Sequence, residues 1–144
     1  MSEIKNEQLA SDLRTVTTRL IKKLRKKSAT GSQLSLTERS TMSLLYKGEY
    51  LPSELAAMEK ITNQSMSQIL SHLLELGYIT RTASITDKRK VLISLSAEGE
   101  KTLLRVRSER DEWIKKAVAE TCDAEEQELL RKAIITLTKL VDFD

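Results

Sequence analysis

The chain has 144 residues, of which 24 are Lys or Arg and 21 are Asp or Glu, so its formal net charge is +3. This length suits one domain with a hydrophobic core and is too short for two ordinary domains, and so small a charge excess identifies no nucleic-acid partner by itself. A single Cys excludes an internal disulfide and a cysteine-based zinc site, and no signal-like or membrane-spanning apolar run is present. We therefore expect one cytoplasmic domain over residues 1–144, without a metal, a cofactor or a membrane partner.

The N-terminal segment, residues 4–27, is predicted to form a long amphipathic helix. Its apolar residues recur at helical spacing, and the small polar residues of segment 28–33 then break the pattern. Basic residues gather in its last turns, where they suit the helix dipole and also provide a positive surface. The apolar stripe consists of Leu9, Leu13, Val16, Leu20 and Leu24.

Two shorter helices are expected next. Ser35 and Glu38 have the spacing of a capping box, in which each side chain accepts a hydrogen bond from an N–H group at the helix start. The following helix has Pro52 in its first turn, where proline's missing N–H costs no hydrogen bond, and it extends to about Lys60.

Residues 62–76 combine apolar residues at helical spacing with an opposite face of short polar side chains and almost no charge. A solvated helix face is usually rich in Lys and Glu, whereas Gln and Ser suit the base edges in the major groove of DNA. His72 either contacts a base or a phosphate, or merely flanks the groove. The polar residues assigned to DNA are Gln64, Ser65, Ser67, Gln68 and Ser71, and the apolar ones are Met66, Ile69, Leu70, Leu73 and Leu76.

A β-hairpin is expected after Gly77, which ends this helix. β-Branched and aromatic residues predict a strand over 78–82, and alternating apolar residues predict the return strand over 91–95. The hairpin tip carries three adjacent cations, which repel one another unless an anion binds. These cations are Lys88, Arg89 and Lys90.

Two charged residues near the tip have alternative roles. Asp87 either starts the turn or holds the Arg89 guanidinium in place for the minor groove, where Arg responds to the negative potential of narrow A·T-rich segments. We favour the pairing, because a turn residue does not require Arg two positions later. Arg81, on the first strand, either braces the loop or contacts a phosphate.

Two further helices are expected after the hairpin. Ser96 caps a helix from residue 97 to about 120, and Asp123 caps the last one. The first and last helices carry apolar stripes, and the small central unit can bury its own core without them. We therefore expect these stripes to pack against a second copy of the chain. The stripe of the last helix is Leu130, Ala133, Ile134, Leu137 and Val141.

The hairpin, with Asp87-Lys88-Arg89 at its turn and the sequence LSAEG at its end, resembles the winged helix-turn-helix core of the MarR family of transcriptional regulators. The sequence LTER at 36–39 resembles the family's opening of its second helix, and LPSELA at 51–56 resembles the first helix of its helix-turn-helix. Gln68 stands where many members carry Arg.

This resemblance implies a mostly α fold, in which a winged helix-turn-helix over residues 34–96 has a two-stranded β wing. It further implies that the helices over 4–27 and 97–142 form a dimerisation region. The expected function is that of a homodimeric repressor that binds a pseudo-palindromic site on double-stranded DNA and responds to a small-molecule effector. Family effectors bind between the dimer helices and the winged unit, where Trp113 is a candidate contact, although we favour a place in the dimer core for this residue.

Functions of other classes fit the sequence less well. An enzyme is not expected, because the only His and the only Cys stand 50 positions apart and no glycine-rich phosphate loop or metal-spaced cluster occurs. A helical protein-binding adaptor remains the alternative, since exposed apolar stripes also bind partners. That alternative leaves the cationic hairpin tip and the Gln- and Ser-rich face without a role.

Overall fold

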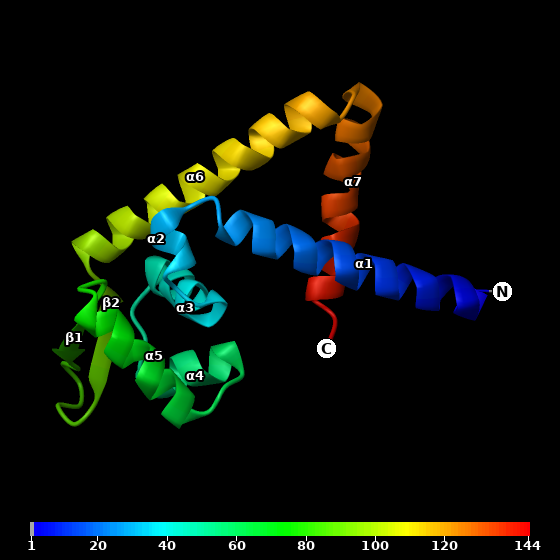
Figure 1. Ribbon diagram of the computed structural model, residues 1–144. Coiled ribbons are helices and arrows are strands. Elements are labelled where there is room, and N and C mark those ends of the chain that lie inside the picture. Colours follow the sequence, from blue (N-terminus) through cyan, green and yellow to red (C-terminus); the bar gives the residue numbers. More distant parts are fainter. Residues whose placement is uncertain (1) are drawn as a thin grey trace.

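The computed structural model describes residues 2–144; Met1, the first residue of the predicted domain, lies outside the described residues. Helices α3, α4 and α5 and the β1–β2 hairpin form one unit, from which α1, α6 and α7 extend (Figure 1). The fold is mostly helical with a two-stranded antiparallel sheet, as predicted. The elements are α1 (Ser2–Arg25), α2 (Ala29–Ser32), α3 (Leu36–Lys47), α4 (Pro52–Glu59), α5 (Asn63–Glu75), β1 (Ile79–Ala83), β2 (Val91–Leu95), α6 (Ala97–Thr121) and α7 (Ala124–Val141).

Side-chain caps fix where the helices begin. The predicted capping box of α3 is present, because the Glu38 N–H donates to Ser35 Oγ at 3.0 Å and the Ser35 N–H donates to Glu38 Oε1 at 2.7 Å. Ser96 caps α6 and Asp123 caps α7, as predicted. At α4 the capping residue is Leu51, whose N–H donates to Glu54 Oε1 at 2.8 Å, so only half of a capping box exists there.

Two boundaries differ from the sequence prediction. The segment 28–33, predicted as a break, contains the short helix α2, because Ser28 Oγ accepts the Gly31 N–H at 3.1 Å. The first strand begins at Ile79, since Tyr78 takes part in the cap that follows the C-terminal end of α5. Its N–H donates to the Leu73 carbonyl at 3.0 Å across Gly77, whose φ of 79° is the left-handed conformation that ends many helices.

The hydrophobic core lies within the winged unit and extends to the first turns of α6. Burying each such aliphatic side chain stabilises the fold by roughly 1.5–3 kcal/mol. Gly99 lets α6 approach closely, because a Cβ at this position would lie 2.0 Å from the Tyr78 carbonyl oxygen. The core residues are Leu34, Met42, Leu45, Leu55, Ala56, Met66, Leu70, Leu73, Ile79, Ile93 and Leu103.

The hairpin pairs Ile79 with Leu95 and Ala83 with Val91 in antiparallel register. A third segment joins it, because Tyr50 and Ile93 exchange two backbone hydrogen bonds, Tyr50 N–H to Ile93 O at 3.2 Å and Ile93 N–H to Tyr50 O at 2.8 Å. The sequence pattern gave no indication of this bridge. It fixes the middle of β2 to the segment that leads into α4.

Helices α1 and α7 contain no buried residue in the single chain. Their apolar stripes are exposed, as the sequence led us to expect of helices that lack a partner. None of the helices within residues 2–144 is both long enough and apolar enough to cross a membrane.

Candidate nucleic-acid interface

Helix α5 presents the two faces that its sequence predicted, except that Leu76, predicted for the apolar face, is the C-cap residue and is 38% exposed. Met66, Leu70 and Leu73 are buried, and Ile69 is half-buried beside them. The polar residues point outward, with no acidic or basic side chain before His72. Thr62 caps the helix by accepting the Ser65 N–H at 3.0 Å, which leaves the first turn well ordered. The exposed residues are Gln64, Ser65, Ser67, Gln68 and Ser71.

Two of the predicted DNA-binding residues have partners within the chain. The Ser65 hydroxyl accepts a hydrogen bond from Thr62 Oγ1 at 2.9 Å, so its side chain supports the cap. His72 Nδ1 donates to Glu38 Oε2, which joins the middle of α5 to the start of α3. The second of these contacts makes His72 a positioning residue for the helix, and it occupies one of the two ring nitrogens.

Burial raises the pKa of Glu38. Hydrogen bonds from the Ser35 N–H and the His72 ring, together with the His72 charge, lower it by more, so the pKa of Glu38 lies below its ordinary value of 4.5. A carboxylate with a lowered folded-state pKa stabilises the fold above its unfolded-state pKa, and this stability is lost as the pH falls through the folded-state value. We therefore expect the stability difference between wild type and Glu38→Gln to shrink below pH 4.5.

Chemical denaturation at pH 7 and at a series of lower pH values measures this difference. Glu98→Gln, which removes an exposed carboxylate from the first turn of α6, serves as the control. A difference between wild type and Glu38→Gln that stays constant down to the acid transition contradicts the assignment.

The wing is the β1–β2 hairpin, and its tip, residues 84–90, holds Arg89 in the manner predicted. Asp87 accepts hydrogen bonds from Arg89 Nε at 3.2 Å, from Arg89 Nη2 at 3.4 Å and from the Arg89 N–H at 3.1 Å. The side-chain bonds, and then the backbone bond, lower the pKa of Asp87. The Arg89 side chain is nonetheless 91% exposed, so the pair orients the guanidinium without covering it.

Replacing Arg89 with Ala should weaken binding to DNA and reduce its salt dependence. Each lost phosphate-neutralising contact removes about 0.9 from the slope of log K against log salt. Fluorescence anisotropy at several salt concentrations measures the slope, and Lys101→Ala, at an exposed position on α6, is the matched control. If Arg89→Ala changes neither the affinity nor the slope, the wing is only a solvated loop.

Two grooves join the wing to the helix-turn-helix. One, of about 490 Å³, brings Arg89 and Lys90 of the wing beside Ser53 of α4 and Asn63 of α5. The other, of about 220 Å³, is lined by Arg81 and by Ser67 of α5, among others. Arg81 therefore lies on the same side of the molecule as the polar face of α5.

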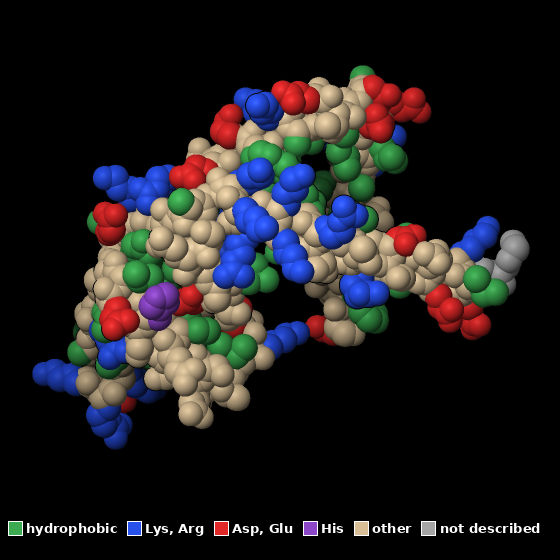
Figure 2. All heavy atoms as spheres, viewed as in Figure 1, with side chains coloured by type: hydrophobic (Ala, Val, Ile, Leu, Met, Phe, Trp, Pro, Cys, Tyr) green, Lys and Arg blue, Asp and Glu red, His purple; other side chains and the backbone are tan. Residues whose placement is uncertain are grey.

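Ser53 and Asn63 were not among the predicted site residues. Both lie in the first turn of their helices, where backbone N–H groups lack acceptors and suit the phosphates of DNA. The sequence could have indicated both residues. Ser53 follows the proline that starts α4, and Asn63 precedes Gln64, so each was predictably in the first turn of a helix. Figure 2 shows Lys and Arg side chains at the end of the hairpin, at the lower left, and a second group over the C-terminal half of α1.

Trp113 lies apart from these grooves, on α6. The centre of its ring is 5.6 Å from Lys23 Nζ and 5.2 Å from Lys27 Nζ, so Lys23 near the end of α1 and Lys27 just after it pack over the ring. The contact ties α1 to α6. It also gives two members of the basic cluster in α1 a structural role beyond their interaction with the helix dipole.

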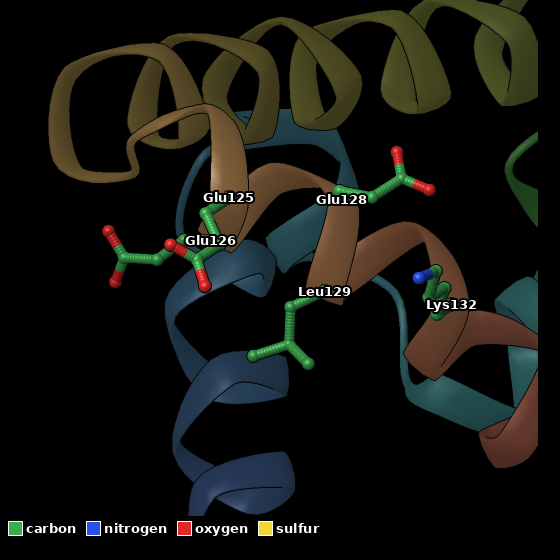
Figure 3. A pocket seen from close by; sticks show the side chains of 5 residues that line it. All are labelled: Glu125, Glu126, Glu128, Leu129 and Lys132. Carbon is green, nitrogen blue, oxygen red and sulfur yellow. The ribbon is translucent and has the colours of Figure 1, made fainter.

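A hollow of about 320 Å³ on α7 does not belong to the interface. Figure 3 shows the carboxylates of Glu125 and Glu126 on one side of it and that of Glu128 on the other, so they do not converge on a common ligand. Carboxylates also repel DNA phosphates. The lining residues are Glu125, Glu126, Glu128, Leu129 and Lys132.

Comparisons with known proteins agree with this arrangement. The sequence model of the MarR family matches residues 32–90. An HTH-type transcriptional regulator of Mycobacterium tuberculosis (strain CDC 1551 / Oshkosh) is 32% identical over 136 residues, which are 94% of this chain and 94% of that relative.

Solved structures extend the likeness to the fold. A protein of Pseudomonas aeruginosa PA01 described as a transcriptional regulator is 32% identical, with a TM-score of 0.81, over 97% of this chain and 98% of that one. A mutant of S. aureus MepR bound to an oligodeoxyribonucleotide is 18% identical, with a TM-score of 0.69, over 93% of this chain and 98% of that one.

A capped polar helix beside a cationic two-stranded wing defines a winged helix-turn-helix protein. Within that class, the chain belongs to the MarR family. It is therefore a DNA-binding transcriptional regulator and not an enzyme, and this membership also decides against the adaptor that the sequence left as an alternative.

Proposed function

We propose that the chain is a homodimeric repressor that binds a pseudo-palindromic operator through two copies of α5 and of the wing. The observation that carries the proposal is the position of the cationic wing beside the uncharged polar face of α5, with grooves between them. Gln64, Ser67 and Gln68 read base edges, and Arg89 enters the minor groove. Phosphates and neighbouring groups are contacted by Ser65, Ser71, His72, Arg81, Lys88 and Lys90, with Asp87 orienting Arg89.

The homodimer is supported by the exposed apolar residues of α1 and α7. A patch of this extent needs a partner, and a two-fold axis lets each chain cover the other. In this arrangement residues 34–96 form the DNA-binding core, and residues 4–27 and 97–142 form the dimerisation region. The two copies of α5, the recognition helices, then enter successive major grooves that lie about 34 Å apart along the duplex.

Repression follows if the dimer occupies a promoter, and a small-molecule effector relieves it by favouring a different separation of the two winged units. Such an effector acts only if it binds one separation more tightly than the other. Because the relatives are bacterial proteins, and because an operator is bound on the chromosome, we place the protein in the cytoplasm.

An electrophoretic mobility shift with the DNA upstream of the chain's own gene tests this function. We expect a discrete complex that survives an excess of random DNA of equal length, since specific sites are typically bound about 10³–10⁷ times more tightly. A reporter driven by the same DNA should lose expression when the protein is present. Equal binding to both DNAs contradicts operator recognition, and increased expression contradicts repression.

A further inference from the structure

The most exposed large apolar side chain within residues 2–144 lies at the tip of the wing. It belongs to Ile85, which is 98% exposed. Single exposed apolar residues are common on protein surfaces, so the exposure alone assigns no role. Phase in exposure is not shared with the next residues, Phe143 and Val141, which lie at the C-terminal end of the chain beside the proposed dimer contacts. Ile85 instead belongs to the part of the molecule that faces DNA.

The loop at the wing tip holds Ile85 beyond the strands. The Ser84 N–H donates to the Lys90 carbonyl at 2.9 Å, which closes the loop, and the Lys90 N–H donates to the Asp87 carbonyl at 3.0 Å, which forms a turn. The hydroxyl oxygens of Ser84 and Thr86, on either side of Ile85, lie 3.1 Å apart and share a hydrogen bond. Because a β-branched side chain has few rotamers, Ile85 loses little entropy when a surface covers it.

The charges beside Ile85 decide which surface the tip meets. Residues 84–90 carry three cations and one carboxylate, so the tip attracts an anionic surface. Ile85 and Arg89 are the residues next inward from the pair formed by Ser84 and Lys90, so both lie beyond the backbone hydrogen bond that closes the loop. A duplex that receives Arg89 in its minor groove therefore also meets Ile85.

We propose that Ile85 enters the minor groove beside Arg89 and selects against G·C pairs at that position. The minor groove is about 6 Å wide, which accepts an aliphatic side chain between its sugar walls. A·T and T·A pairs present only acceptors there, whereas a G·C pair adds the N2 amino group of guanine. This group occupies space that the side chain needs, and it loses its water without gaining an acceptor. The proposal rests on the proposed function, which places Arg89 in the minor groove.

Ile85 and Arg89 act on DNA through different forces. Arg89 contributes charge, and each phosphate-neutralising contact adds about 0.9 to the slope of log K against log salt. Ile85 contributes buried apolar area and releases no counterions, so it does not change this slope. Replacing Ile85 should therefore lower log K by the same amount at every salt concentration.

Two duplexes of equal length measure the preference without knowledge of the operator. One consists of G·C pairs, and in the other inosine replaces every guanine. Inosine lacks only the N2 amino group, so the two duplexes offer the same hydrogen-bonding groups in the major groove and differ in the minor groove. We expect the full-length wild type to bind the inosine duplex about tenfold more tightly, as measured by fluorescence anisotropy.

Ile85→Val and Ile85→Thr form a matched pair of variants. Both side chains are β-branched and of similar shape, so the loop is disturbed equally, and they differ in one methyl or hydroxyl group. Ile85→Val should keep most of the preference for the inosine duplex. Ile85→Thr should lose most of it, because its hydroxyl can accept a hydrogen bond from the amino group of guanine. Leu36→Thr, which changes an exposed residue at the start of α3, should behave as the wild type.

The proposal is overturned if the wild type binds both duplexes equally, or if Ile85→Thr prefers the inosine duplex as strongly as Ile85→Val does. It is also overturned if Ile85→Thr reduces the salt slope as Arg89→Ala is expected to, because the substitution then acts through the charges of the loop. Failure of the proposed function looks different. In that case Arg89→Ala changes neither affinity nor slope on these duplexes, or the upstream DNA is not bound specifically although the preference for inosine is present.

Discussion

Replacing Ile134 with Glu should reduce affinity for the operator by about 10²–10⁴, because it separates two DNA-binding units that act together. Ile134 lies on the exposed stripe of α7 and is itself 62% exposed in the single chain. A carboxylate there stays hydrated in a monomer but has no partner in an apolar dimer interface. The monomer keeps its winged unit, whose core does not include α7.

Sedimentation velocity at micromolar concentration and anisotropy with a labelled operator measure the two effects separately. Leu36→Glu is the matched control, since Leu36 is an apolar residue at the start of α3 with 54% exposure that lies outside the proposed dimerisation region. It should remain a dimer with nearly full affinity. If the wild-type chain sediments as a monomer and still binds its operator fully, both the interface and the two-groove mechanism are wrong.

Features that depend on residues close in sequence were predictable. The capping box of α3 joins Ser35 to Glu38, and the wing joins Asp87 to Arg89, so in each case the spacing alone brings the groups together. The polar and apolar faces of α5 were likewise predicted, because helical periodicity decides which residues share a face. The end of α5 at Gly77 follows from that residue's freedom to adopt positive φ.

Features that depend on residues far apart were not predictable in this way. The contact of His72 with Glu38 spans 34 positions, and neither the sequence around His72 nor the sequence around Glu38 predicts it. The same holds for the Tyr50–Ile93 bridge and for Arg25, Arg39 and Arg110, which come close together from α1, α3 and α6. In the sequence, Arg39 and Arg110 look like ordinary surface charges, and only the packing of α3 against α6 buries their N–H groups.

This division also applies to the interface itself. The sequence predicted which residues of α5 and the wing point outward, but not which of them already have partners. Ser65 and His72 have partners in the chain, whereas Gln64, Ser67 and Gln68 have no side-chain hydrogen bonds within residues 2–144. A Gln amide without an internal partner is free to bond a base, so base reading is best sought at these positions.

Replacing Gln68 with Ala should therefore cost specificity more than affinity. Gln can form two hydrogen bonds with adenine in the major groove, and a good bidentate pair contributes about 1–3 kcal/mol of discrimination against the wrong base. Gln68 is exposed on α5 one turn after Gln64, within reach of a groove that the N-terminal half of the helix enters. We expect the variant to tolerate a base change at one position in each half-site that the wild type rejects.

Binding constants for the operator, for operators changed at single positions and for random DNA, all at one salt concentration, measure the effect. Glu75→Gln, at the C-terminal end of the same helix, is the control and should keep the wild-type preferences at every position. Arg89→Ala gives a different comparison, because a loss of charge at the wing weakens binding to every one of these DNAs, and most of all to those with a narrow A·T-rich minor groove. If Gln68→Ala weakens the operator and random DNA by the same factor, Gln68 contacts only the phosphate backbone, and the reading of bases must be assigned to other residues of α5.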